Sequence, residues 1–323
     1  MRVTNSMLSK SFLRDLNRNQ NNLKKINNQL SSGKEISRPS DNPYKAARSM
    51  QLSSDIKAAI QYNENIKDTT NWLDTTDTAL QQLEKSFQRI RELMVAGGNA
   101  AYGSDEKKAI KDEINEKVNE IAQILNTNFD GKYIFGGTKV NSKPVAVQAD
   151  GTTGNNKLYY SSSDGTIIAD PSTSNEMEML ASGLIVEISQ GVTMKYNVSS
   201  TEILEFGEGA NKVNVMNLLT DITNSLDSED SSEVTGNLLS QMDSTISNLL
   251  KIMSEVGAKQ NRMEAAATQN EDQILNLKDV LSKTEDIDFA EKTIEASVAQ
   301  TVYMASLQVS ARIIQPTLLD FLR

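Results

Sequence analysis

A seven-residue repeat of apolar side chains runs through residues 44–95 and constrains the fold more strongly than any other feature of the chain. The repeat consists of Ile66, Leu73, Leu80, Phe87 and Met94, and a companion position is held by Tyr62, Leu83 and Ile90, with Thr69 and Thr76 as weaker members. Apolar residues at this interval are typical of a helix that packs lengthwise against another helix. The repeat therefore predicts one very long helix over residues 44–95, which needs a partner of similar length.

A second repeat of the same kind can supply that partner. It lies between Val234 and Lys283 and consists of Met242, Leu249, Val256 and Met263, followed with a shifted phase by Ala267, Ile274, Leu277 and Leu281. Shorter helical stripes over residues 104–125 and 213–226 lie between the two long ones in the sequence. The simplest packing pairs the long helices with each other and the first helix of the chain with the last.

Each end of the chain predicts a further helix with one apolar face. The N-terminal face consists of Phe12, Leu16, Leu23, Ile26 and Leu30, and the C-terminal face consists of Ile294, Val298, Thr301, Val302, Ala305 and Val309. Burial of five such side chains falls far short of the conformational entropy that is lost when about 30 residues become ordered. We therefore expect these faces to be buried between subunits; a coiled coil within one chain is the alternative.

The segment LSSGKEISRPSDNP, residues 30–43, separates the first helix from the long one. Gly33 interrupts the helical pattern, and each of the two prolines lacks a backbone donor and restricts the residue before it. The segment therefore predicts an extended connector. Ser40 or Asp41 is expected to cap the long helix, with Pro43 in its first turn.

Two charged residues of this connector are candidate assembly contacts. Arg38 and Asp41 flank a proline and can pair with neighbouring subunits. The alternative is that they bond the backbone of the connector or face water, where exposed ion pairs contribute little. The sequence leaves both interpretations open.

The pattern changes after Phe129. Asp130-Gly131 and Gly136-Gly137 are turn signals, and the stretch up to residue 209 is rich in glycine. Five short runs resemble strands: Leu158–Tyr160, Thr166–Ile168, Leu184–Ile188, Val192–Val198 and Ile203–Phe206. We interpret this stretch as a small β-rich insert between helical segments.

Together these patterns predict a mainly α protein. The expected architecture is an elongated helical bundle or coiled coil, built from the N- and C-terminal segments, with a small β-rich inserted domain. Residues 1–43 and 285–323 are expected to form a terminal helical domain for assembly. Residues 44–138 and 210–284 are expected to form a long-helix core domain, and residues 139–209 the inserted domain.

Composition excludes several classes of function. The chain has no histidine and no cysteine, which excludes Ser-His-Asp and Cys-His catalytic sites, disulfides and the common zinc sites. Its net charge of −10 disfavours nucleic-acid binding, and no apolar run is long enough to cross a membrane. We expect no catalytic residue, cofactor or metal; a glycosidase that uses carboxylates alone stays open only if its acidic residues converge in a cleft.

Three segments resemble the flagellin and hook-associated protein family. They are the connector LSSGKEISRPSDNP, the element NFDGKYIFGGT at residues 128–138, and the C-terminal run LLDFL at residues 318–322. The three occur in the order in which the family carries them. The resemblance adds Leu318, Leu319 and Phe321 to the candidate assembly residues.

The resemblance implies a structural subunit of the bacterial flagellum. Such a subunit is exported unfolded by the type III apparatus without a cleaved signal, after a cytoplasmic chaperone has held its C-terminal helix. Outside the cell it joins a ring at the hook–filament junction, between another hook-associated protein and the flagellin filament. The terminal helices are then expected to form an inner tube. The alternative within the family is a flagellin that forms the bulk filament.

Overall fold

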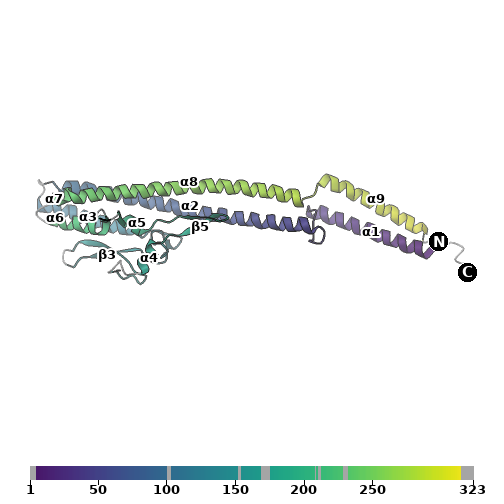
Figure 1. Cartoon of the computed structure of the whole chain (residues 1–323), viewed down its shortest axis with the longest axis horizontal. Helices are drawn as coiled ribbons and strands as arrows, with labels where there is room; N and C mark the ends of the chain where they lie inside the picture. Colours follow the sequence, from purple (N-terminus) through teal and green to yellow (C-terminus); the bar gives the residue numbers. More distant parts are fainter. Residues whose placement is uncertain are drawn as a thin grey trace, which may run out of the picture. The chain divides into compact units, whose positions relative to one another are not determined.

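The computed structural model describes residues 5–99, 103–151, 154–168, 175–207, 209, 212–227 and 232–313 (Figure 1). The chain divides into two compact units, the first made of residues 1–60 and 272–323 and the second of residues 61–271. The helices are α1 (Asn5–Ser32), α2 (Pro43–Gly97), α3 (Ser104–Leu125), α4 (Asn175–Ala181), α5 (Ser200–Leu204), α6 (Val215–Asp227), α7 (Ser232–Thr235), α8 (Asn237–Glu285) and α9 (Phe289–Ile313). The predicted mainly α fold is confirmed.

The strands pair two by two, and every pair is antiparallel. The pairs are β1 (Asn128–Phe129) with β2 (Lys132–Tyr133), β3 (Val145–Ala149) with β4 (Asn156–Tyr160), β5 (Ile185–Ser189) with β6 (Val192–Lys195), and β7 (Glu205–Phe206) with β8 (Val213–Asn214). The predicted turn at Asp130-Gly131 joins β1 to β2, and both residues have the positive φ that a tight hairpin turn requires.

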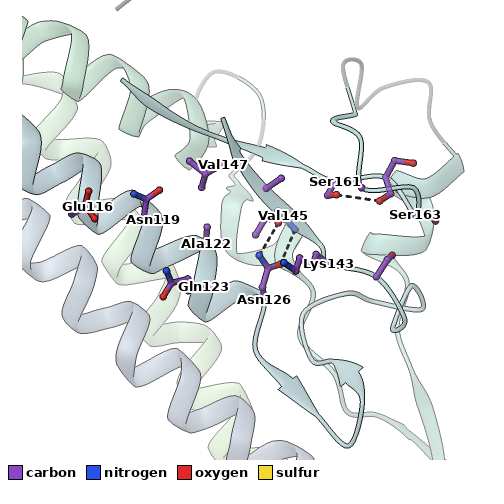
Figure 2. Close-up of a pocket in the computed structure, with 14 residues that line it drawn as sticks. Glu116, Asn119, Ala122, Gln123, Asn126, Lys143, Val145, Val147, Ser161 and Ser163 are labelled. Carbon is purple, nitrogen blue, oxygen red and sulfur yellow. Dashed lines mark hydrogen bonds between the residues drawn. The ribbon is translucent and has the colours of Figure 1, made fainter. Parts of the chain in front are cut away.

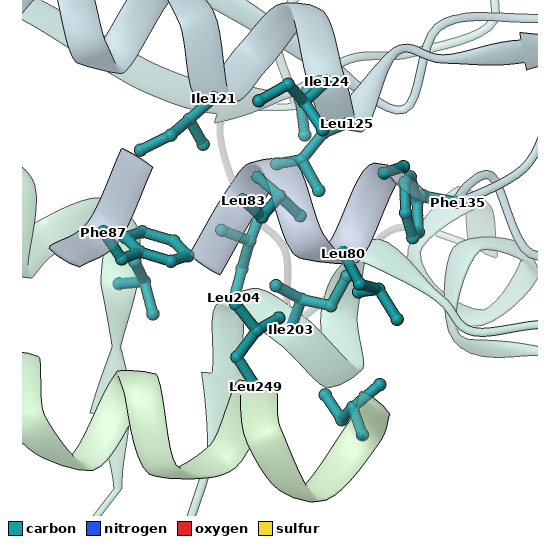
Figure 3. Packing of buried hydrophobic residues seen from close by; sticks show 14 of the residues in the cluster. Leu80, Leu83, Phe87, Ile121, Ile124, Leu125, Phe135, Ile203, Leu204 and Leu249 are labelled. Atoms are coloured by element: carbon teal, nitrogen blue, oxygen red, sulfur yellow. The ribbon is translucent and has the colours of Figure 1, made fainter. Parts of the chain in front are cut away.

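The seven-residue repeats form the core of the second unit. Ile66, Leu73, Leu80, Phe87 and Met94 on α2 are buried, as are Met242, Leu249, Val256 and Met263 on α8. Arg91 pairs with Asp243 at 2.5 Å, and Gln260 donates to Asp74 at 2.9 Å, so the two helices run antiparallel here. Figure 3 shows side chains of α2, α3, α5 and α8 converging in this core.

The inserted segment contributes to the same core. Its buried side chains belong to one continuous apolar cluster with the helices: Val145, Leu158, Tyr160, Leu180, Ile188, Met194, Val198, Ile203 and Leu204. Buried Asn270 on α8 also donates a 2.9 Å hydrogen bond to the carbonyl of Ile188 in β5. Hairpins this small are not stable alone, so packing against the helices holds them.

Several predicted boundaries and strands are wrong. Ile203 and Leu204 lie in α5, because a capping box between Ser199 and Glu202 starts a helix there. Residues 166–168 contribute only an isolated bridge from Ile167 to Ser161, β6 ends at Lys195, and β3 was not predicted. The helix expected from residue 213 begins at Val215, after a short strand.

In the first unit, α1 and α9 lie side by side and antiparallel (Figure 1). Gly33 ends α1 with φ +72°, a left-handed conformation that favours glycine at a helix C-terminus. The predicted cap of α2 is wrong: Asn42 is the cap, since its Oδ1 accepts from the Lys45 amide at 3.2 Å. Among the residues of this unit whose burial the structure describes, the buried hydrophobic ones are Ala46, Leu52, Ile56, Ala59 and Ile287, none of which lies on α1 or α9.

Candidate assembly site

The apolar face predicted on α9 points to solvent in the isolated chain. Ile294 is 67% exposed, Val298 57% and Val302 45%, and Ala305 is also exposed. The half-buried positions of α9 carry mostly small or polar residues: Lys292, Glu295, Ala296, Ala299, Tyr303, Ser306 and Ser310. Helix α9 therefore packs within the chain through its less apolar side, and among the described residues nothing covers its more apolar side.

The apolar face predicted on α1 is half-buried. This holds for all of its members: Phe12, Leu16, Leu23, Ile26 and Leu30. The buried residue of α1 among those described is the polar Gln29, whose Nε2 donates to the carbonyl of Glu35 at 2.7 Å. In their described parts, neither terminal helix completes an apolar core, although the two lie together.

A shallow apolar groove joins the two predicted faces. Its volume is about 360 Å³, and it is lined by Ile26 with Asn19 and Asn22 from α1, and by Ile294, Glu295, Val298, Ala299 and Val302 from α9. The structure thus brings together four predicted assembly residues from opposite ends of the chain. The remaining members of both faces lie on the same helices outside this lining, and Leu318, Leu319 and Phe321 lie outside the described residues.

The exposed apolar surface of α9 is wider than the predicted face. Phe289, Met304 and Leu307 are also exposed and lie outside its spacing. A helix that is apolar on several sides is normally buried on several sides. The sequence already carries this feature, because apolar residues occur on several sides of the helix. The predicted spacing of one apolar face does not include them.

The predicted connector residues lie on the surface. Both Arg38 and Asp41 are exposed, and Asp41 Oδ2 accepts hydrogen bonds from the backbone amides of Arg38 at 3.0 Å and Ser37 at 3.3 Å. Asp41 therefore closes a turn of the connector. A role of either residue in contacts between subunits stays a prediction.

Glu285, at the end of α8, bonds to residues of the connector and of α2 within the first unit. Its carboxylate pairs with the Lys34 ammonium and accepts a 2.6 Å hydrogen bond from Ser49 Oγ, and its carbonyl accepts from the Glu35 amide at 2.6 Å. Burial raises the pKa of Glu285, but the hydrogen bonds from Lys34 and Ser49 and the Lys34 charge outweigh it and hold this pKa below the ordinary value. Sequence reasoning missed this residue, because no local pattern links positions so far apart.

The second unit holds a polar cleft of about 620 Å³ between α3 and the inserted segment (Figure 2). Asn126 spans part of it, donating from Nδ2 to the Val145 carbonyl at 2.9 Å and accepting from the Val145 amide. The single carboxylate among the described lining residues is Glu116. The described lining of this cleft therefore does not supply the pair of carboxylates that the glycosidase alternative requires.

None of the helices in the described residues is both long enough and apolar enough to cross a membrane.

Comparison with known proteins matches both ends of the chain. Residues 3–140 match the bacterial flagellin N-terminal helical region, and residues 239–322 match the bacterial flagellin C-terminal helical region. Flagellar hook-associated protein 3 of Escherichia coli strain K12 is 22% identical over 316 residues, which cover 95% of each chain. A flagellin of Clostridium tyrobutyricum is 31% identical over 141 residues, which cover 43% of this chain but only 37% of that flagellin.

A solved structure has a similar fold. The crystal structure of flagellar hook-associated protein 3 from Legionella pneumophila superposes with a TM-score of 0.58 at 14% identity. The superposition covers 72% of this chain and 98% of that one. The similarity of fold therefore extends over most of this chain.

Proposed function

The chain belongs to the flagellin family, and from this we propose that it is a structural subunit of the bacterial flagellum at the hook–filament junction. The observation that carries the proposal is the exposed apolar surface of the paired terminal helices. Ile294, Val298 and Val302 are large and apolar, yet each remains at least 45% exposed. A surface of this kind typically marks a protein–protein interface.

Neighbouring copies would cover this surface in a ring. Full burial of an aliphatic side chain contributes roughly 1.5–3 kcal/mol, so burying the exposed remainder of Ile294, Val298 and Val302 contributes about 1 kcal/mol each in every subunit. The terminal helices would then line an inner tube. Such a contact forms only in the assembly, which fits a subunit that has to pass a narrow export channel unfolded.

Further partners follow from the same proposal. A flagellin would contact the ring on the filament side and another hook-associated protein on the hook side. A cytoplasmic chaperone would hold the C-terminal helix before export, which would cover its apolar sides and prevent premature association. Export would proceed without a cleaved signal peptide, and the assembled protein would lie outside the cell.

A flagellin of the bulk filament is the second candidate. The lengths of the matches favour a junction protein over a flagellin. The E. coli hook-associated protein 3 matches over 95% of both chains, whereas the clostridial flagellin matches over 37% of its own length. The match thus spans nearly the whole of the first relative and little more than a third of the second.

Localisation distinguishes the two candidates. Cells that produce the protein with a small tag in an exposed loop should carry one labelled band at the base of each filament, and deletion should leave hooks without attached filaments. Restoration of filaments by the untagged gene is the control. Label along the whole filament, or normal attached filaments after deletion, would contradict the junction proposal.

A further inference from the structure

Helix α1 carries a row of positive charge on its exposed side. We call this row the basic stripe, and it consists of the exposed side chains of Lys10, Arg14, Arg18, Lys24 and Lys25. At 3.6 residues per turn these five positions fall within about 120° of the helix circumference, on the side opposite the apolar face. Through their side chains, they form no hydrogen bond or ion pair with any residue that the structure describes.

A groove of about 640 Å³ lies between α2 and α8 in the second unit. Ile66, Met263 and Ala267 supply apolar side chains to its lining. We call it the acidic groove, because its described lining carries one ammonium group, that of Lys67, and four exposed carboxylates: Glu64, Asp74, Glu264 and Glu271. Asp74 accepts a 2.9 Å hydrogen bond from Gln260, whereas the other three carboxylates have no hydrogen-bond or ion-pair partner within the described ranges.

We propose that the basic stripe of one copy of the protein docks in the acidic groove of a second copy. The inference rests on the proposed function, in which neighbouring copies meet in a ring, and it names a contact separate from the apolar face of α9. Guanidinium groups such as those of Arg14 and Arg18 can form two parallel hydrogen bonds with one carboxylate, which orients the partners as well as attracting them. Complementary charge of this kind steers association and fixes the register of the contact.

The two surfaces also match in length and in apolar content. At 1.5 Å per residue, the stripe from Lys10 to Lys25 is about 22 Å long, and the groove from Glu64 to Asp74 on α2 extends over about 15 Å. The exposed side chains of Met7 and Leu13 border the stripe on the helix surface, where they can contact the apolar part of the groove lining. The contact therefore combines ion pairs with a small apolar area.

The contact joins two different surfaces of the same protein. Copies related head to tail each use the stripe toward one neighbour and the groove toward the other. A contact of this type builds a closed ring if the rotation between neighbours closes, and this agrees with the proposed ring.

Other charged partners complement only one of the two surfaces. An anionic bilayer or a nucleic acid could bind the basic stripe, but it would leave the acidic groove unmatched, and the net charge of −10 on the chain would oppose its approach. A cationic protein could bind the groove but not the stripe. A second copy supplies the complement of both.

The test measures self-association of the full-length protein by sedimentation velocity over a range of protein concentrations. Salt screens exposed ion pairs, so we expect association at about 50 mM NaCl that weakens about tenfold or more at about 500 mM. Association through the apolar face of α9 should not weaken with salt, and Val298→Asp should remove it while the salt-dependent contact persists. Failure of the stripe contact and failure of the proposed function are therefore distinguishable.

Charge reversal locates the contact. Arg14→Glu combined with Arg18→Glu should weaken self-association about tenfold, and so should Glu264→Arg combined with Glu271→Arg. A mixture of these two variants should associate again, because the reversed stripe of one variant complements the reversed groove of the other. This restoration would also show that both variants are folded.

Arg48→Glu combined with Lys57→Glu is the matched control. It reverses two exposed charges of α2 outside both surfaces and should leave self-association unchanged. Absence of association at low salt would overturn the proposal, as would association that the α1 variant does not weaken, or failure of the mixture to associate. Binding to phosphatidylglycerol vesicles by a protein that does not self-associate would also overturn it, and would assign the stripe to a lipid surface.

Discussion

Asn19 Nδ2 on α1 donates a 3.2 Å hydrogen bond to Ser306 Oγ on α9, although the two residues are 287 positions apart in the sequence. The bond aligns the first helix with the last through polar side chains. Because such a contact contributes only about 1 kcal/mol, it sets the register of the two helices but cannot replace an apolar core. The paired helices consequently leave hydrophobic surface for a neighbouring molecule.

Replacing Val298 by aspartate should separate folding from assembly. Val298 is 57% exposed, so the change should alter the free energy of unfolding of the monomer by less than about 0.5 kcal/mol. In the proposed ring the same carboxylate would be buried without a partner, which is costly. We expect a normal thermal unfolding curve for the purified protein together with loss of filament attachment in cells.

Gln300→Asp is the matched control for this variant. Gln300 is exposed on the same helix and is already polar, so the substitution adds the same charge without removing an apolar contact. It should support attachment. Normal attachment with Val298→Asp would show that this face of α9 does not lie between subunits.

Hydrogen exchange should rank the elements of the monomer by burial. The described parts of α1 and α9 contain no buried hydrophobic residue, whereas α2 buries Leu80 and Phe87 and α8 buries Leu249 and Val256 almost completely. Amides of the terminal helices should therefore exchange faster than those around Leu80 and Leu249, and proteases should trim the ends first, up to about residues 40 and 290. Equal protection at the ends and in the middle would contradict the proposed dependence on neighbours.

Periodicity explains what the sequence could predict. The long helices and their buried seams followed from residues such as Leu73, Leu80 and Phe87, because a seven-residue repeat is visible without any distant contact. The predicted strand Ile203–Phe206 is right for Glu205 and Phe206, which form β7, and wrong for Ile203 and Leu204, which lie in α5. Its β-branched and aromatic residues favour a strand, but Ser199 and Glu202 form the capping box that begins a helix, and this local signal was present in the sequence.

The arrangement at the candidate site was only partly accessible from the sequence. Spacing correctly placed Ile26, Val298 and Val302 on helical faces, and the structure brings them to one groove. The contact of Glu285 with Lys34 joins two ends of the chain, and only the folded connector brings these side chains together. Periodicity reports a helical face but not which face of a second helix packs against it.

The carboxylate of Glu285 should make the connector sensitive to acid. Its pKa is lowered in the folded protein, so its stabilising contribution is present above the ordinary glutamate pKa of about 4.3 and is lost as the pH falls through the lower folded value. Glu285→Gln should therefore destabilise the connector by about 1 kcal/mol at neutral pH, a modest figure because Lys34 is more than half exposed. The difference from the wild type should shrink below about pH 4.

Protection factors of two connector amides measure this effect. The Glu35 amide bonds to the Glu285 carbonyl and the Ile287 amide to the Gly33 carbonyl, so both report opening of the connector. Glu291→Gln, which changes an exposed carboxylate on α9, should leave them unaffected at every pH. If the difference in these protection factors between the wild type and Glu285→Gln grew on acidification, it would contradict a stabilising role of the ionised Glu285 carboxylate.

Gly137→Ala should be far more destabilising than Gly131→Ala. Both glycines have positive φ, which costs alanine about 1–2 kcal/mol. At Gly137 the added methyl would also lie 2.4 Å from the carbonyl oxygens of Met179 and Leu180, whereas at Gly131 it would meet nothing within 4 Å. We expect losses of about 3–4 kcal/mol and about 1 kcal/mol respectively in urea denaturation. Equal losses would mean that the turn, and not the close approach to α4, requires glycine in the GGT element.

Replacement of residues 145–205 by a short flexible linker tests whether the insert is a separate domain. The three-part division predicted from the sequence implies that the helical scaffold survives. The apolar cluster argues otherwise, because Tyr160 and Leu204 of the insert pack in one core with Leu83 and other residues of α2, α3 and α8. Their removal would expose the helix side chains that they cover, each worth about 1–3 kcal/mol. We expect a lower Tm and loss of cooperative unfolding, while an unchanged Tm would establish the insert as an independent domain.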